Sequence, residues 1–100
     1  MKWNEIEINE AGTAFIYSGS KLFGRDYLAV MKFHEPGLAP VKDESGWYHI
    51  NLQGEPIYHE RYNRAFGYYF DRATVVSGKS YFHILTEGQR AYKEDYAWVG

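Results

Sequence analysis

Hydrophobic and polar residues alternate at the start of the segment 46–62, GWYHINLQGEPIYHERY. Over residues 47–52, one side of an extended chain carries Tyr48, Ile50 and Leu52, and the residues between them fall on the other side. A period of two is that of a β-strand. The next four residues, QGEP, predict a turn, because Gly allows positive φ and Pro cannot extend a ladder. An apolar pair then begins a return strand, so the segment predicts a β-hairpin.

The same pattern occurs again further along the chain, at a constant offset of 34 in the numbering. Six pairs of identical residues keep this offset: His49 and His83, Ile50 and Ile84, Gly54 and Gly88, Tyr58 and Tyr92, Glu60 and Glu94, Tyr62 and Tyr96. An earlier copy begins at Gly12 and Ile16, which precede Gly46 and Ile50 by the same offset. After it the offset becomes 35, as between Gly19 and Gly54, which places a one-residue deletion in a turn. A period of about 20 to 50 residues indicates stacked units that share a core.

A short strand is expected ahead of each copy. Residues 39–41 (APV) and 73–75 (ATV) show the offset of 34 as well, and residues 5–8 occupy the same place before the first copy. The sequence therefore predicts one all-β domain, residues 1–100, built as a tandem repeat of β-hairpin or three-strand units at approximately 5–38, 39–72 and 73–100. The pattern leaves the arrangement open between a solenoid-like stack, a propeller-like closure and a partly curled sheet.

A family resemblance follows from the order of these features. Gly37–Val41 (GLAPV), a Gly-Trp pair, a strand with Ile-Asn, a Gly turn and a Tyr resemble the bacterial WG β-repeat family. The likeness covers nearly the whole chain from residue 12 and is strongest over 37–64 and 80–100, where WVG at the end also matches. The Trp-Gly pair that names the family stands here as Trp47-Tyr48 and Tyr81-Phe82.

The resemblance to WG β-repeats implies tandem hairpin units, often attached to other domains, with no shared catalytic activity and no agreed ligand. Arrays in that family are usually longer than three units. The chain is therefore expected to be either a fragment of a longer array or a compact version of one.

Composition narrows the class of partner. Aromatic residues make up 19% of the chain and ten of them are Tyr, which favours strands. The formal charge of −2 supplies no basic field for nucleic acid, and the absence of Cys excludes disulfides and thiolate zinc sites. The first ten residues contain no secretion signal, and the apolar run 27–31 is too short to cross a bilayer. We expect a soluble cytoplasmic protein without nucleic-acid or membrane partners.

Two sets of repeated polar residues are candidates for chemistry. His49 and His83 would bring two imidazoles together for a metal or a pH-sensitive column, but Phe15 occupies the matching position in the first copy. We therefore interpret this column as a half-buried face and expect no metal and no cofactor.

The acids Asp26, Glu60 and Glu94 are the second set and could form carboxylate pairs for glycoside hydrolysis. One full unit separates them, and basic residues lie nearby, which favours solvated, ion-paired turns. No phosphate loop, serine elbow or His-Glu-x-x-His pattern occurs. We expect no catalytic residues and no enzyme.

Aromatic residues supply the candidate binding surface. The column Tyr27, Tyr62 and Tyr96 could form an exposed stacking ladder, but such rings more often fill a corner of the core with the hydroxyl bonded to backbone. The densest aromatic run lies at 66–70 and, where exposed, would contact a partner. The candidate binding residues are Trp47, His49, Phe66, Tyr68, Tyr69, Phe70, Tyr81 and His83.

The function expected from these features is a non-catalytic interaction module that binds a protein partner or an attached domain. An alternative is a repeat that binds choline or carbohydrate in aromatic cages, for which the candidates are Trp47, Tyr48, Tyr81 and Phe82. The period of 34 is much longer than that of choline-binding repeats. A further alternative is a structural spacer in a longer array. Exposed edge strands at both ends of an open stack would also allow self-association.

Overall fold

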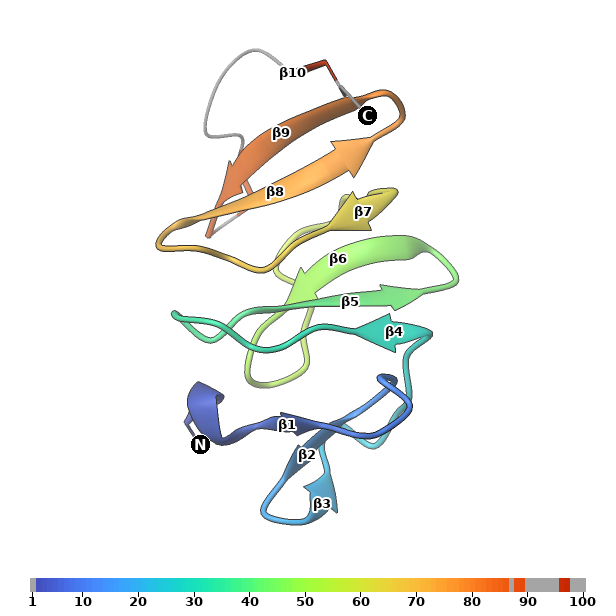
Figure 1. Ribbon diagram of the computed structural model, residues 1–100, viewed down its shortest axis with the longest axis vertical. Coiled ribbons are helices and arrows are strands. Elements are labelled where there is room, and N and C mark those ends of the chain that lie inside the picture. The colour runs from blue at the N-terminus through green and yellow to red at the C-terminus, as the bar shows by residue number, and fades with distance from the viewer. Residues whose placement is uncertain (1, 87, 90–95, 98–100) are drawn as a thin grey trace.

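The fold is a stack of antiparallel β-sheets with almost no helix (Figure 1). The computed structural model describes residues 2–86, 88–89 and 96–97. The molecule measures 42 × 25 × 23 Å, and the sheets follow one another along the longest axis. Within the described ranges, no helix has the length and apolar character needed to cross a membrane. The predicted all-β class is confirmed.

Three sheets are present in the described part. The first has the order β1 (Glu7–Ile8), β2 (Phe15–Tyr17), β3 (Ser20–Lys21). The second has the order β4 (Ala29–Val30), β5 (Ala39–Asp43), β6 (Gly46–Ile50). The third has the order β10 (Tyr96–Ala97), β9 (Ser80–Leu85), β8 (Arg72–Ser77), β7 (Arg64–Ala65). Each order is linear, so none of these sheets closes or curls onto itself, and the curled alternative does not describe them. A single 3-10 turn, η1 (Trp3–Glu5), precedes the first sheet.

The sheets divide the chain at other places than the predicted units. Strand β4 belongs by sequence to the segment 5–38 but pairs with β5, with Val30 opposite Val41. Strand β7 likewise belongs to 39–72 but pairs with β8. Each of these two sheets is therefore completed by a strand from the preceding segment. A hydrogen-bonded ladder therefore connects each of these segments to the next, in addition to the covalent chain.

The second and third sheets have the same strand register. Val41 faces Tyr48 in one hairpin, and the residues one period later, Val75 and Phe82, face each other in the next. The isolated bridge between Trp47 and Tyr62 is matched by the pairing of Tyr81 with Tyr96. Of the expected third copy, Tyr92, Glu94 and residues 98–100 lie outside the described residues.

One backbone hydrogen bond of the first layer has a counterpart in the second. The Leu22 amide donates to the Phe15 carbonyl at 2.8 Å, and the Ile57 amide donates to the His49 carbonyl at 3.1 Å. The donors Leu22 and Ile57 are 35 residues apart in the sequence, whereas the acceptors Phe15 and His49 are 34 residues apart. The turn between β2 and β3 is correspondingly tight, with Tyr17 opposite Ser20. The first hydrogen bond spans one residue fewer than the second, and this turn lies within its span.

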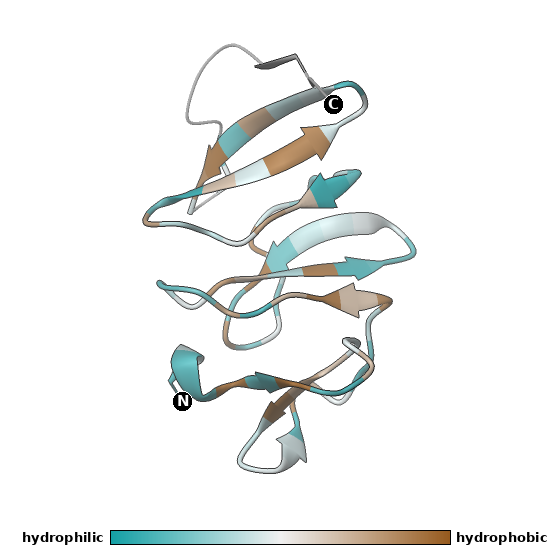
Figure 2. Cartoon of the chain, in the orientation of Figure 1, coloured by the Kyte–Doolittle hydropathy of each residue, from teal (hydrophilic) through white to brown (hydrophobic). Residues whose placement is uncertain are grey.

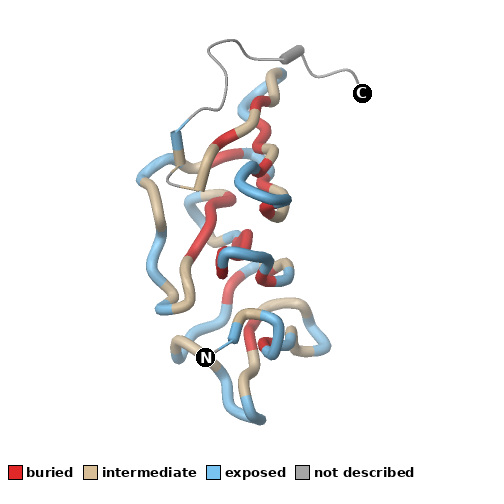
Figure 3. Tube along the Cα trace, turned by 90° about the vertical axis from the view of Figure 1, so that its left-hand side faces the viewer, coloured by how far each residue is buried: buried red, intermediate tan, exposed pale blue. Residues whose placement is uncertain are grey.

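Buried residues occur in every layer along the long axis (Figure 3). Figure 2 shows hydrophobic and hydrophilic residues mixed along the strands, with hydrophobic stretches on β8 and β9. Strand β6 is buried on both faces over Trp47–Ile50, because it lies in the middle layer. The alternating side chains of β6 therefore point to two faces that are both buried, whereas the usual alternation has one buried and one exposed face. Strand β9 instead alternates buried with partly exposed residues.

Two turn glycines fit closely against aromatic rings of another part of the chain. A Cβ on Gly54 would lie 2.6 Å from the Phe23 ring, and one on Gly88 would lie 2.7 Å from the Tyr58 ring. Both glycines also have positive φ, which glycine tolerates without steric cost. These positions therefore need glycine for two separate reasons.

Candidate functional site

The predicted binding residues differ greatly in exposure. Trp47, His49 and Tyr68 are buried, so they cannot contact a partner in this conformation. Phe66, Tyr81 and His83 are partly buried. Only Tyr69 and Phe70, which are 76% and 80% exposed, present most of their surface to solvent. The structure narrows the candidate site to this pair and its surroundings.

Tyr69 and Phe70 lie on a tight turn, Tyr69–Arg72, which we call the aromatic turn. It connects β7 to β8 on the left-hand side of Figure 1. The Tyr69 amide donates to the Arg72 carbonyl at 2.7 Å, and the Arg72 amide donates back at 3.2 Å. Phe70 has a φ of 60°, in the left-handed region that L side chains rarely adopt. The turn therefore fixes two adjacent rings at its end, with centroids 4.6 Å apart.

Two hollows flank the Phe70 ring. The first, which we call the His83 pocket, has a volume of about 410 Å³ and is lined by Gly67, Tyr69, Phe70, Asp71, Arg72, Thr74 and His83. The second, the Glu35 pocket, has a volume of about 520 Å³ and is lined by Glu35, Pro36, Phe70, Asp71 and Thr86. Phe70 and Asp71 belong to both. The aromatic turn thus forms a ridge between two depressions.

Buried polar contacts hold the segment that leads to the aromatic turn. His49 Nδ1 lies 2.6 Å from the Tyr58 hydroxyl, and its Nε2 lies 2.8 Å from the Phe66 carbonyl oxygen. Because a carbonyl only accepts, Nε2 carries the proton, and the Tyr58 hydroxyl donates to Nδ1. The Tyr68 ring packs on the His49 ring at 4.7 Å, and its hydroxyl donates to the Leu85 carbonyl at 2.6 Å. The segment 66–68 before the aromatic turn is therefore anchored on two sides.

Burial shifts the pKa values in this network. Burial lowers the pKa of His49 to about 4, although its bond to the Phe66 carbonyl acts in the opposite direction. Burial also raises the pKa of Tyr58 and of Tyr68 above the ordinary tyrosine value. All three groups are therefore neutral at neutral pH, as buried groups without a counter-ion need to be.

The first layer contains an apolar version of the same arrangement. Phe15 packs against Phe23 at 6.2 Å and against Phe33 at 4.7 Å. The rings at the matching sequence offsets of 34 and 35 are His49, Tyr58 and Tyr68, with separations of 5.8 Å and 4.7 Å. The polar atoms of the second layer are thus an addition to a packing geometry that also forms without them. His83 has the same register as His49 but lies partly exposed at the His83 pocket, so the two do not form one site.

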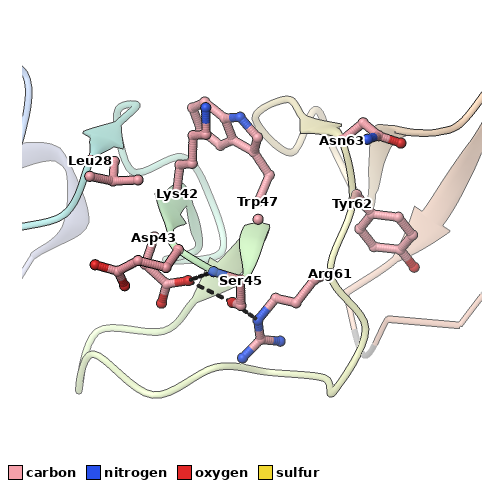
Figure 4. Close-up of a pocket in the computed structure, with 10 residues that line it drawn as sticks. Leu28, Lys42, Asp43, Ser45, Trp47, Arg61, Tyr62 and Asn63 are labelled. Carbon is pink, nitrogen blue, oxygen red and sulfur yellow. Dashed lines mark hydrogen bonds between the residues drawn. The ribbon is translucent and has the colours of Figure 1, made fainter.

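A third pocket, about 400 Å³ in volume, lies beside the turn between β5 and β6 (Figure 4). Two of its four charged residues, Asp43 and Arg61, already have partners. Asp43 accepts from the Ser45 amide at 2.8 Å and from the Tyr48 hydroxyl at 2.7 Å. Arg61 donates to the Ser45 hydroxyl at 2.9 Å, and its Nη1 reaches three consecutive carbonyls, of Tyr58, His59 and Glu60. We interpret this network as a clasp that holds the 58–61 loop rather than as a ligand site.

The clasp also explains the pKa of Asp43. Burial by itself would raise that pKa, but hydrogen bonds from Ser45 and Tyr48, together with the nearby Arg25 guanidinium, outweigh it and lower the pKa to about 2. The same burial and the bond to Asp43 raise the pKa of Tyr48 to about 12.

Three of the four rings proposed for an aromatic cage are covered by this chain itself, and the fourth, Tyr81, is partly buried. Trp47, Tyr48 and Phe82 are buried. The Arg61 guanidinium lies 3.9 Å from the centre of the Tyr48 ring, and the Arg64 guanidinium lies 5.4 Å from that of Trp47. A choline cation would have to displace these arginines.

The remaining candidates have structural surroundings. Asp26 pairs with Lys21 at 2.8 Å, as expected for an ion-paired turn, and Glu94 lies outside the described ranges. The Tyr27 and Tyr62 rings are buried as expected for corner residues, but the Tyr27 hydroxyl has no hydrogen-bond partner among the described atoms. In the described part of the chain, no group of three or more His, Asp or Glu side chains could hold a metal ion.

Sequence reasoning missed two parts of the site. It gave no role to Glu35 and Pro36, which come from another turn and approach Phe70 only through the stacking of layers. It also did not find the Asp43–Arg61 clasp. Two signals pointed to these places: Asp-x-Ser, which favours a side-chain turn, and the Pro-Gly pair at 36–37.

Comparison with known proteins adds no family assignment. Searches of family models, of curated proteins and of solved structures found no match for the chain.

Proposed function

We propose that this protein is a non-catalytic β-repeat interaction module and that the aromatic turn is its contact point with a protein partner. The observation that carries the proposal is the state of Phe70. Its side chain is 80% exposed, and its backbone is in the left-handed region. An exposed aromatic ring gains no burial energy, and positive φ costs a non-glycine residue about 1 kcal/mol or more.

The comparison with Phe23 sharpens this argument. Phe23 has almost the same φ, 62°, but its ring packs against Phe15 and Gly54. Burial there compensates for the backbone strain. Phe70 contacts Tyr69, which is itself exposed, so no comparable compensation exists among the described contacts. A residue that breaks local rules without a folding benefit is typical of a functional site.

The repeat character and the resemblance to WG β-repeats are part of the proposal. The common register of the second and third sheets, the one-residue deletion in the first turn and the two equivalent ring triads support it. Repeat proteins use such stacks to build extended contact surfaces. The exposed aromatic turn favours this function over that of a passive spacer, which needs no exposed rings.

Selection from a random peptide library tests the proposal. We expect phage-displayed peptides that bind the wild-type protein and lose binding to Phe70→Gly. Glycine adopts the left-handed backbone of this position readily, so this variant keeps the fold while removing the ring. Loss of the ring should reduce binding at least about tenfold, the usual effect of removing an aromatic anchor.

Leu28→Ser is the matched control. Leu28 is also exposed, at 58%, but it lines the pocket beside the β5–β6 turn, on the opposite side of the molecule in Figure 1. Peptides that depend on the aromatic turn should bind this variant normally. Selected peptides that bind Phe70→Gly as well as the wild type, or a selection that enriches none, would contradict the proposal.

A further inference from the structure

We propose that the aromatic turn recognises a peptide segment in which a Lys or Arg follows or precedes an apolar side chain, with the basic residue seated in the Glu35 pocket. This inference rests on the proposed function and adds the chemical class of the partner.

The charge of the Glu35 pocket is the first step. Two carboxylates, of Glu35 and Asp71, line it, and no Lys or Arg does so in the described part of the chain. Asp71 forms an exposed ion pair with Arg72 at 3.1 Å. Glu35 forms none with the described residues and therefore supplies the main negative charge. Because like charges repel each other at close range, an acidic peptide segment would bind weakly in this pocket.

The shape and polarity of the walls are the second step. The Phe70 ring and Pro36 form an apolar surface next to the two carboxylates. A Lys or Arg side chain has the matching chemistry, because its methylene stem covers apolar surface while its charged head reaches a carboxylate. The pocket holds about 520 Å³, which is ample for one long side chain.

The third step is the behaviour of other aromatic rings in this protein. Arg25 lies 4.3 Å from the centre of the Tyr27 ring, Arg61 lies 3.9 Å from that of Tyr48, and Arg64 lies 5.3 Å from that of Phe66. The described contacts of Phe70 include only the neighbouring Tyr69 ring. A guanidinium or ammonium from a partner would give Phe70 the type of contact that these rings obtain within the chain.

The two pockets define how the segment approaches. Phe70 separates the Glu35 pocket from the His83 pocket, so a partner that spans the ridge places one side chain in each. The His83 pocket contains Arg72 beside Asp71 and is therefore less acidic. Gly67 and the Tyr69 ring in its lining favour the apolar side chain there. This arrangement yields a basic residue beside an apolar one.

The test repeats the peptide selection with two charge variants. The first, Glu35→Gln with Asp71→Asn, removes both carboxylates of the pocket. The second, Glu10→Gln with Glu44→Gln, changes net charge by the same amount at exposed positions that do not line it. Glu35→Gln alone is included because it leaves the Asp71–Arg72 pair intact. Peptides selected on the wild type are sequenced, and fluorescein-labelled versions are titrated by anisotropy at low and high NaCl.

We expect Lys and Arg to be enriched next to apolar residues in the selected peptides. Binding of these peptides should fall about fivefold in the pocket variant and about twofold to threefold in Glu35→Gln, and high salt should weaken it, as for exposed charge pairs. The control pair Glu10→Gln and Glu44→Gln should bind like the wild type.

The outcomes separate this inference from the proposed function. Selected peptides without basic residues that still lose binding to Phe70→Gly would overturn the charge inference and leave the proposed function standing. Equal weakening by the pocket variant and by the control pair would also overturn it, because net charge alone would then explain the effect. Failure to select any peptide that depends on Phe70 would overturn the proposed function itself.

Discussion

At the scale of single residues, Phe70 and His49 contrast in what they give to the fold. Phe70 is exposed and strained, whereas His49 is fully buried with both ring nitrogens bonded. Phe70 lowers the stability of the fold while it presents a ring at the surface. His49 stabilises the buried segment that leads to this ring. Substitutions at the two positions should therefore change stability in opposite directions.

Phe70→Gly should stabilise the protein. Glycine removes the strain of positive φ, which we expect to add about 1 kcal/mol to the free energy of unfolding, less the extra freedom of glycine in the unfolded chain. Urea denaturation measures the difference. Phe70→Ala, which keeps a Cβ, should show little of this gain. A variant Phe70→Gly less stable than Phe70→Ala would show that the ring contributes to folding after all.

Acid should weaken the fold through His49. Its pKa in the folded protein is about 4, below the ordinary 6.5, so the unfolded chain binds the proton more readily. The stabilisation is fully present above pH 6.5 and is lost as the pH falls towards 4, by roughly 3 kcal/mol in all. Urea midpoints measured across this range should fall steadily.

His49→Phe serves as the control for the acid effect. It copies the Phe15 arrangement and removes the titrating group, so the slope between pH 6.5 and 4 should disappear, although the variant is less stable at neutral pH because the Phe66 carbonyl loses its donor. The contribution of Asp43, whose pKa of about 2 lies below its ordinary value, is lost only at lower pH. An unchanged slope in His49→Phe would assign the acid effect to other groups.

At the scale of elements, neighbouring parts of the chain contact each other at turn glycines and through β4 and β7, which pair with the hairpins of the following segments. Gly54 approaches Phe23, and Gly46 approaches the Tyr62 carbonyl, where a Cβ would lie 3.0 Å from the oxygen. Such contacts allow no extra methyl group without movement of a ring or of backbone.

Gly54→Ala should therefore destabilise the protein more than Gly19→Ala. Both residues have a φ of 79°, but a Cβ on Gly19 meets open space, whereas one on Gly54 lies 2.6 Å from the Phe23 ring. Gly19→Ala should cost about 1 kcal/mol from backbone strain alone, and Gly54→Ala about 1 to 3 kcal/mol more from overpacking. Thermal or urea unfolding of the two variants gives the comparison. Equal costs would mean that Phe23 moves away freely.

The sequence predicted the offsets and the longer strands better than it predicted exposure, but the return strand expected from Ile57-Tyr58 is reduced to an isolated bridge between Ile50 and Pro56. Identical residues at one spacing revealed the register, since equivalent hairpins need the same Gly turns and strand periods. The pairing of β4 and β7 with the following hairpins could not be predicted from the sequence, because strands of two residues are too short to show a hydrophobic period. The burial of Trp47 and His49 depends on β6 being the middle layer, a property of the stack and not of the strand. The Glu35 pocket joins residues 35, 70 and 86, which no local pattern connects.

At the scale of the whole molecule, the core of the described residues consists of two clusters along a long, narrow stack. One includes Phe15 and Val41, and the other includes Val75 and Ile84. The end layers of the described chain lie apart from each other along the long axis, with the middle layer between them (Figure 1). In stacked repeats, stability is close to a sum of unit and neighbour terms.

A core substitution should therefore loosen its own end of the molecule first. We expect Phe15→Ala, at about 3 to 5 kcal/mol, to remove hydrogen-exchange protection from the Leu22 amide while the β8 and β9 amides stay protected. Ile84→Ala should give the reverse pattern. The same loss of protection throughout the molecule in both variants would indicate a single all-or-none unit.

Strands β4 and β7 each complete a sheet whose hairpin comes from the following segment of the chain. This arrangement affects how such a chain can lengthen. Under the repeat interpretation, a stretch that covers one full period, cut at any phase, contains one hairpin and one donated strand. A gene duplication of that length would consequently supply the new layer with its own hairpin. It would also supply one short strand that pairs with the hairpin of the next layer, wherever the breakpoints fell. Growth of the array would need no redesigned junction, and variation could then concentrate on turns such as the one that carries Phe70.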